Sequence, residues 1–195
     1  MQLNAEMLLQ GYANGAFPMA EASGQIYWYA PDPRAIIPVG NYKPSRSLRP
    51  VINQKVFEVK IDTCFEEVMR CCAQPRFAGD ETWISEEIIR AYCDLHEIGL
   101  AHSVEAYFEN ELVGGLYGVA LGAAFFGESM FFEKSNASKV AFHYLIEVLR
   151  KNNFQLLDTQ FMNDNVERYG AIEIPKAMYE ARLIEALQTS CRFEL

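Results

Sequence analysis

Residues 111–161 read ELVGGLYGVALGAAFFGESMFFEKSNASKVAFHYLIEVLRKNNFQLLDTQF, and this stretch decides the fold. Apolar runs typical of strands cover 112–119 and 123–130, a helical run covers 137–151, and another strand-like run covers 154–160. The preceding run, 102–108, joins 112–119 through a polar turn and predicts a β-hairpin. The sequence therefore predicts three strands, a helix and a fourth strand, in that order.

Two polar clusters interrupt these apolar strands, GESM at 127–130 and LDTQF at 157–161. Alternate side chains of a strand share a face, so we expect Phe126, Glu128 and Met130 to point one way. Asp158 and Gln160 are expected to share a face of their own strand. Polar side chains inside a sheet are costly unless they are paired or used, so both clusters are candidates for function.

The best break in the chain is Pro31-Asp32-Pro33, because two prolines in three residues continue neither a helix nor a central strand. We place a small N-terminal domain at 1–33 and the main domain at 34–195. In the small domain we expect a helix at 5–14, a turn at 16–19 and a strand at 25–29. Further helices are expected over 64–73, 85–98 and 163–169, and two more are expected to begin at 45 and at 175. Further strands are expected at 35–38, 57–61 and 171–174.

Composition indicates a globular protein, since half of the 195 residues are hydrophobic. No apolar run reaches the roughly 18 residues of a membrane span, and the N-terminus lacks the basic region of a secretory signal. The five cysteines contain no CxxC pair, so neither a zinc site nor a disulfide framework is expected. These features predict a cytoplasmic protein without a membrane partner or a bound metal.

The charge distribution is uneven. The net charge of −9 argues against a general nucleic-acid binder. Residues 31–76 nevertheless hold eight Lys and Arg against five Asp and Glu, whereas 77–133 hold one against eleven. Any contact with a nucleic acid is therefore expected to be local and to centre on 34–76, whereas a solvated surface is the ordinary explanation of the acidic segment.

Motifs along nearly the whole chain resemble the leucyl/phenylalanyl-tRNA–protein transferase family. They are, in order, YANGAFPM, YWYAPDPRAIIP, SRSLR, TWIS, AYCDLHEIGLAHSVE, VGGLYGVALG, FFGESMF, NASKVA, LLDTQF and GAIEIP. The predicted order of elements likewise resembles the mixed sheet of the N-acetyltransferase superfamily, an α/β fold. The resemblance implies transfer of a leucyl, phenylalanyl or methionyl group from charged tRNA to the α-amine of proteins with N-terminal Lys or Arg, which marks them for degradation by the N-end rule pathway. An aminoacyl ester is already activated, so no cofactor is expected.

The resemblance implies catalytic roles for Asp158 and Gln160. An ionised Asp158 would hold the Gln160 amide, and the Gln160 carbonyl would accept a hydrogen bond from the attacking amine. Glu128 is a third candidate, since a carboxylate there would hold the cationic end of the acceptor protein. The competing interpretation of Asp158 is a buried structural hydrogen bond to the backbone.

The resemblance also implies binding residues. Met130, Leu116 and either Phe125 or Phe126 would form an apolar pocket for the donor side chain, although such residues more often belong to a core. Trp83, and secondarily Met19, would contact the terminal adenosine of the tRNA.

Arg46 and Arg49 open a helix, where cations oppose the helix dipole, and this placement indicates either an anionic tRNA backbone or ordinary solvated arginines.

The sequence disfavours two other functions. A CoA-dependent N-acetyltransferase usually cradles pyrophosphate with a glycine-containing loop before the long helix, but 132–139 read FEKSNASK and contain no glycine. A non-catalytic RNA-binding or adaptor module is disfavoured by the acidic net charge and by the polar set of Glu128, Asp158 and Gln160.

Overall fold

The computed structural model describes residues 2–75 and 82–194. Its strands are β1 (Phe17–Ala20), β2 (Ile26–Tyr29), β3 (Arg34–Ile36), β4 (Glu58–Ile61), β5 (Ala101–Phe108), β6 (Glu111–Leu121), β7 (Ala124–Phe132), β8 (Leu156–Gln160) and β9 (Ile172–Ile174). Its helices are α1 (Ala5–Ala13), α2 (Leu48–Asn53), α3 (Phe65–Cys72), α4 (Glu86–Glu97), α5 (Ala137–Lys151), α6 (Asp164–Arg168) and α7 (Lys176–Leu187), with a 3-10 turn at Val39–Asn41. None of these helices combines the length and the apolar character needed to cross a bilayer.

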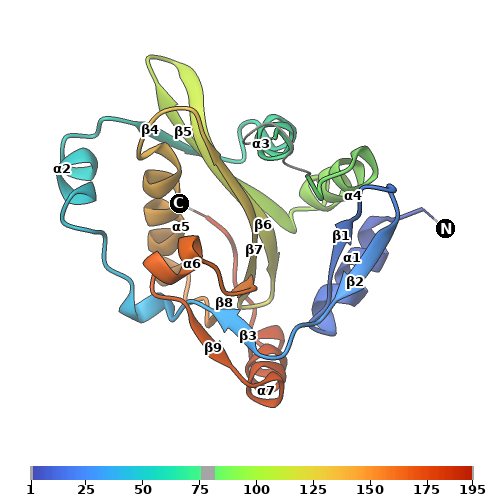
Figure 1. The fold of residues 1–195 in the computed structure, drawn as a ribbon. Helices are drawn as coiled ribbons and strands as arrows, with labels where there is room; N and C mark the ends of the chain where they lie inside the picture. Colours follow the sequence, from blue (N-terminus) through green and yellow to red (C-terminus); the bar gives the residue numbers. More distant parts are fainter. Residues whose placement is uncertain (1, 76–81, 195) are drawn as a thin grey trace.

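The main sheet has the strand order β4-β5-β6-β7-β8-β3-β9 (Figure 1). Strands β5, β6 and β7 form an antiparallel meander, and β8 returns parallel to β7 after α5. The predicted order of three strands, a helix and a strand is therefore confirmed, as is the mixed α/β class. Helix α5 has the predicted bounds because its apolar residues recur with helical spacing over the whole run.

Helices cover both faces of the main sheet (Figure 1). One apolar cluster lies between the sheet and α1, α3, α4 and α7, and it includes Tyr12, Tyr92 and Phe126. A second cluster lies between the opposite face and α5 and α2, and it includes Leu116 and Phe125. Phe125 and Phe126 are neighbours in a strand, so they enter different clusters.

The N-terminal segment forms its own two-stranded sheet, β1-β2. The predicted turn at 16–19 is wrong, because Phe17–Ala20 pairs antiparallel with Ile26–Tyr29. A proline is tolerated in this two-stranded ribbon because each strand is an edge. The domain division at 33/34 stays a prediction: the chain enters the main sheet at Arg34, yet Leu8, Tyr12 and Phe17 belong to the same apolar cluster as α4.

Strand β7 carries a β-bulge at the GESM motif. Tyr117 pairs with Ser129 while its neighbour Gly118 pairs with Gly127, so Glu128 is the extra residue. The expectation that Phe126 and Met130 share a face is therefore wrong: Phe126 lies in the first cluster, and Met130 packs against the second. An extra residue reverses the alternation of side chains beyond it and bends the strand.

Strands β7 and β8 separate just beyond the bulge. Their parallel pairing runs from Ala124 opposite Leu156 to Phe126 opposite Asp158 and then ends. Strand β7 continues to Phe132, whereas β8 ends at Gln160, whose φ of 67° lies in the left-handed region. The two polar clusters therefore flank the place where neighbouring strands diverge.

Candidate active site

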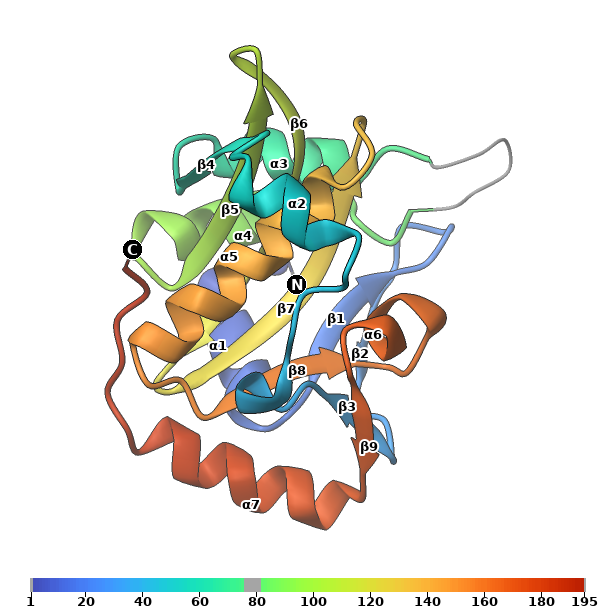
Figure 2. The same cartoon turned by 90° about the vertical axis from the view of Figure 1, so that its left-hand side faces the viewer.

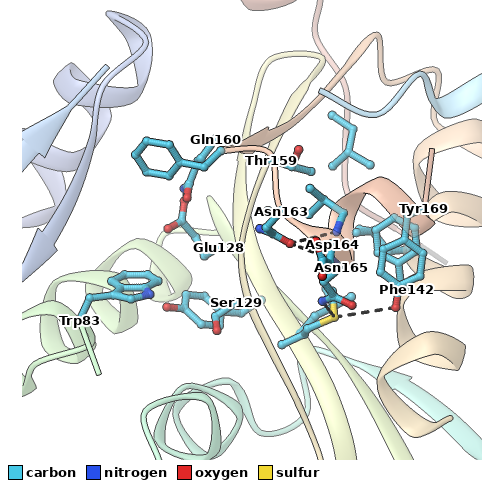
Figure 3. Close-up of a pocket in the computed structure, with 18 of the residues that line it drawn as sticks. Trp83, Glu128, Ser129, Phe142, Thr159, Gln160, Asn163, Asp164, Asn165 and Tyr169 are labelled. Carbon is cyan, nitrogen blue, oxygen red and sulfur yellow. Dashed lines mark hydrogen bonds between the residues drawn. The ribbon is translucent and has the colours of Figure 1, made fainter. Parts of the chain in front are cut away.

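A cavity of about 580 Å³ lies at the divergence of β7 and β8 (Figure 3). Its lining combines two kinds of surface, which we name separately. The apolar end consists of Leu116, Met130, Phe142, Leu145, Leu157 and Tyr169. The polar end consists of Glu128, Ser129 and Gln160 together with Met19, Trp83 and Phe161. The same cavity thus joins apolar surface to a carboxylate and an amide.

The apolar end contains Met130 and Leu116, two of the residues predicted for a donor pocket. Met130 and Leu116 are paired across β7 and β6 and both line the cavity. Phe125 and Phe126 do not line it, and this part of the prediction is wrong, since both rings are fully buried in the two apolar clusters before the strands separate.

Sequence reasoning missed Phe142 and Tyr169, which complete the apolar end. Their rings stack with centroids 4.0 Å apart. The Tyr169 hydroxyl lies 3.9 Å from the Met130 sulfur, and the Asn165 side-chain amide lies 3.5 Å from it. The helical period of 137–151 indicated that Phe142 is buried, but no local pattern indicated a contact with Tyr169.

Glu128 is the central group of the polar end. Its Oε1 accepts hydrogen bonds from the Tyr12 hydroxyl at 2.6 Å and from Gln160 Nε2 at 2.9 Å. The Tyr92 hydroxyl is hydrogen-bonded to that of Tyr12 in turn. Although the residue as a whole is half-buried, its Oε2 is fully buried and has no hydrogen-bond partner among the described residues. Tyr12 and Tyr92 were not predicted, because each reaches Glu128 from a distant helix.

Burial raises the pKa of Glu128 from 4.5 to about 7. The hydrogen bonds from Tyr12 and Gln160 act in the opposite direction, because they stabilise the ionised form, and the charge of Asp158 adds to the rise. A carboxyl with a pKa near neutrality both accepts and releases protons readily at physiological pH, as a general base must.

Gln160 and Asp158 are arranged differently from the prediction. The Gln160 side-chain NH₂ donates to Glu128, whereas Asp158 Oδ1 accepts the backbone N–H of Gln160 at 2.8 Å. Asp158 is completely buried and forms an ion pair with Arg34 at 2.7 Å. The predicted contact between the Asp158 carboxylate and the Gln160 side-chain amide is therefore wrong, because Glu128 and Arg34 occupy the two groups. No described residue donates a hydrogen bond to Gln160 Oε1, which leaves this oxygen for a ligand.

Trp83 and Met19 both line the polar end, as Figure 3 shows for Trp83. The backbone N–H of Ala20 donates to the Trp83 carbonyl at 3.1 Å, which joins β1 to the segment before α4. Arg46 and Arg49 are exposed and do not line the cavity. They belong to the segment that enters α2, which packs on α5, the helix that supplies Phe142 to the apolar end.

Comparisons with known proteins identify the family of the chain. Residues 36–184 match the family model described as leucyl/phenylalanyl-tRNA protein transferase, and residues 1–32 match the model of its N-terminal domain. The chain is 50% identical over 192 residues to the leucyl/phenylalanyl-tRNA–protein transferase of Chlorobaculum tepidum, covering 98% of this chain and 99% of that one. It is 52% identical to the protein of the same name from Gloeobacter violaceus, covering 98% and 97%.

Among solved structures, L-PGS from Bacillus licheniformis has a TM-score of 0.45 at 12% identity, over 86% of this chain and 56% of that one, a likeness too weak to bear on function. The sequence relationships are full-length and close. The chain therefore belongs to the leucyl/phenylalanyl-tRNA–protein transferase family and is an enzyme of the transferase class.

Proposed function

We propose that the protein transfers a leucyl or phenylalanyl group, and also a methionyl group, from charged tRNA to the α-amine of proteins that begin with Lys or Arg. In the cytoplasm this transfer marks the acceptor for degradation by the N-end rule pathway. The observation that carries the proposal is a single cavity in which an apolar end adjoins a carboxyl with a pKa of about 7.

The donor occupies the apolar end and the surface beside it. Its side chain packs on Met130, Leu116 and Phe142, all of which line the cavity and none of which offers a charge. The terminal adenosine stacks on Trp83, because an indole ring stacks on any base face. Met19 contacts the same nucleoside without aromatic stacking.

The acceptor amine is activated at the polar end. Its α-ammonium, with a reference pKa of about 7.7–8, pairs with Glu128 and passes a proton to that carboxylate. Gln160 Oε1 accepts a hydrogen bond from the same nitrogen and directs its lone pair.

The nitrogen attacks the ester carbonyl, and a tetrahedral intermediate forms. The C–N bond is then kept while the C–O bond to the tRNA ribose breaks, and the ribose oxygen takes up a proton. Glu128 donates to the ribose oxygen the proton that it took from the α-ammonium. The ionised carboxylate then takes the second proton, which the nitrogen loses as it becomes an amide, and releases it to solvent.

The tRNA body is bound beside α2, where Arg46 and Arg49 neutralise backbone phosphates. Both side chains are exposed outside the cavity, and Arg49 Nε donates to the Pro44 carbonyl at 3.3 Å. The basic segment that contains them continues to Arg76, which lies outside the described residues. Contacts of this kind weaken as salt rises, because the counterions released on binding gain less entropy in a solution that already holds more salt.

A transfer assay tests the proposal. The parent protein is mixed with leucyl-tRNA or phenylalanyl-tRNA carrying a radiolabelled amino acid, and with a peptide that begins with Lys or Arg. We expect the label to move to that peptide and not to the same peptide with an acetylated N-terminus, since acetylation removes the nucleophile. A parallel reaction with labelled acetyl-CoA is expected to give no product. Transfer from acetyl-CoA but not from charged tRNA would overturn the proposal.

A further inference from the structure

Arg34 is a fully buried charged side chain, with 1% of its surface exposed. It begins β3, and its guanidinium binds Asp158 through two parallel hydrogen bonds: Nε to Oδ1 at 2.9 Å and Nη2 to Oδ2 at 2.7 Å. A buried ion pair is tolerated only when the remaining donors and acceptors are also satisfied. The groups around Arg34 and Asp158 must therefore satisfy the remaining donors and acceptors of both side chains.

Separate parts of the chain complete the pair. Arg34 Nη1 donates to the Gly15 carbonyl at 2.8 Å, and the guanidinium lies over the rings of Phe17 at 4.8 Å and Tyr179 at 4.5 Å. The Tyr179 hydroxyl donates to Asp158 Oδ2 at 2.7 Å. Figure 2 shows α7, β3 and β8 next to one another, although they are distant in sequence.

The buried ion pair of Arg34 and Asp158 determines the backbone conformation of Gln160. The φ of 67° at Gln160 is unfavourable for a residue other than glycine. The hydrogen bond from its backbone N–H to Asp158 Oδ1 favours this turn, as side-chain oxygens do two residues away. In this backbone conformation, Gln160 Nε2 donates a hydrogen bond to Glu128 Oε1 at 2.9 Å.

Asp158 itself is inaccessible to a substrate. Its carboxylate accepts two hydrogen bonds from Arg34, one from Tyr179 and one from Gln160, and it does not line the cavity. A carboxylate in this state holds its neighbours in place and has no free site for the proton of an amine.

We propose that Arg34 and Tyr179 are positioning residues of the transfer reaction, which act through Asp158 to hold Gln160 toward Glu128. Asp158 is then an anchor of Gln160 and not a proton acceptor. This inference rests on the proposed function for its catalytic consequence, whereas its structural consequence, a Gln160 conformation that depends on the Tyr179 hydroxyl, is independent of that function.

The sharpest test is Tyr179→Phe, which removes one hydroxyl and keeps the ring over Arg34. Tyr107→Phe is a matched control, because that hydroxyl is hydrogen-bonded to the Cys64 sulfur at 3.2 Å and lies outside the cavity. For each variant, kcat and the KM for leucyl-tRNA are measured in the transfer assay, and Tm is measured by thermal melt. Hydrogen exchange of the Gln160 backbone N–H is followed by NMR.

We expect Tyr179→Phe to lower kcat about tenfold, since a hydrogen bond to a charged group is lost, and to leave KM unchanged within about twofold. The Gln160 amide should exchange faster than in the parent. Tyr107→Phe should keep the parent kcat and the parent exchange rate, whatever its effect on Tm. A loss of stability alone would move Tm without this split between kcat and KM.

Arg34→Lys is a second variant, which keeps the charge but loses the planar fork and with it one of the two bonds to Asp158. We expect a fall in kcat larger than that of Tyr179→Phe, and if this variant does not fold, the Tyr179→Phe result decides alone. A Tyr179→Phe protein with the parent kcat and the parent exchange rate would overturn the inference. If the parent transfers nothing, the proposed function fails, and amide exchange in Tyr179→Phe against Tyr107→Phe still decides whether Tyr179 positions Gln160.

Discussion

Replacing Glu128 by Gln should stabilise the protein at alkaline pH while removing the proposed general base. The two side chains have nearly the same shape, and a Gln carbonyl still accepts the hydrogen bonds of Tyr12 and Gln160 at the position of Oε1. The variant cannot ionise, however. The comparison therefore isolates the free energy of holding a buried carboxylate in its charged form.

The magnitude follows from the raised pKa. Between pH 4.5 and about 7 the folded protein keeps the Glu128 proton that the unfolded chain has already released, so the free energy of unfolding falls as pH rises through this window. The rise from 4.5 to about 7 corresponds to about 3 kcal/mol, at about 1.4 kcal/mol per pH unit. This fall in the free energy of unfolding is absent below pH 4.5 and complete above pH 7.

Urea unfolding of the parent and Glu128→Gln at pH 5, 6, 7 and 8 measures this difference. The other ionisable groups are common to both proteins and largely cancel. We expect the variant to gain about 2.5 kcal/mol relative to the parent between pH 5 and pH 8, or roughly 5–10 °C in Tm for a chain of this size. A difference in unfolding free energy that does not change with pH would refute the reasoning.

The same variant also tests the role of Glu128 in transfer. The parent rate should rise with pH through about 7, as Glu128 ionises, and continue to rise as the acceptor amine loses its proton. The residual rate of Glu128→Gln should follow the amine alone, with a midpoint near 7.7–8. Equal rates in both proteins at every pH would remove Glu128 from the mechanism.

Three further predictions concern the donor pocket, the tRNA and the bulge. Met130→Ala should favour phenylalanyl over leucyl transfer by about 1–3 kcal/mol, and Met130→Phe should impair both transfers, phenylalanyl transfer more. The measurement is the ratio of the two kcat/KM values. An unchanged ratio would show that Met130 is a core residue and does not contact the donor. Arg46→Ala combined with Arg49→Ala should weaken tRNA binding and flatten its dependence on salt, measured by filter binding at several salt concentrations, and an unchanged slope would place the tRNA elsewhere. Gly118→Ala should lower stability by about 1–3 kcal/mol in urea unfolding, because its Cβ would lie 2.3 Å from the Phe126 carbonyl oxygen; a variant as stable as the parent would show that the bulge relaxes freely.

Local patterns in the sequence predicted most of the elements. The apolar spacing of 137–151 matches α5, and the hairpin and its successor strand were confirmed as β5, β6 and β7. These signals are local, because the periodicity of a helix or a strand is written in its own residues. The polar clusters at 127–130 and 157–161 likewise predicted where Glu128 and Gln160 lie, since polar residues inside apolar strands stand out without any knowledge of their partners.

The contacts among these residues depend on the packing of elements that are distant in the sequence. The bulge at Glu128 reversed the alternation of side chains, and this single extra residue separated Phe126 from Met130. The partners of Glu128 and Asp158 come from distant helices and strands, Tyr12 across 116 residues and Arg34 across 124. A sequence pattern carries no record of such contacts, because they depend on how the helices pack on the sheet and not on local spacing. Local sequence therefore indicates which groups are available for chemistry, and the packing of α1, β3 and α7 around the sheet establishes which of them touch.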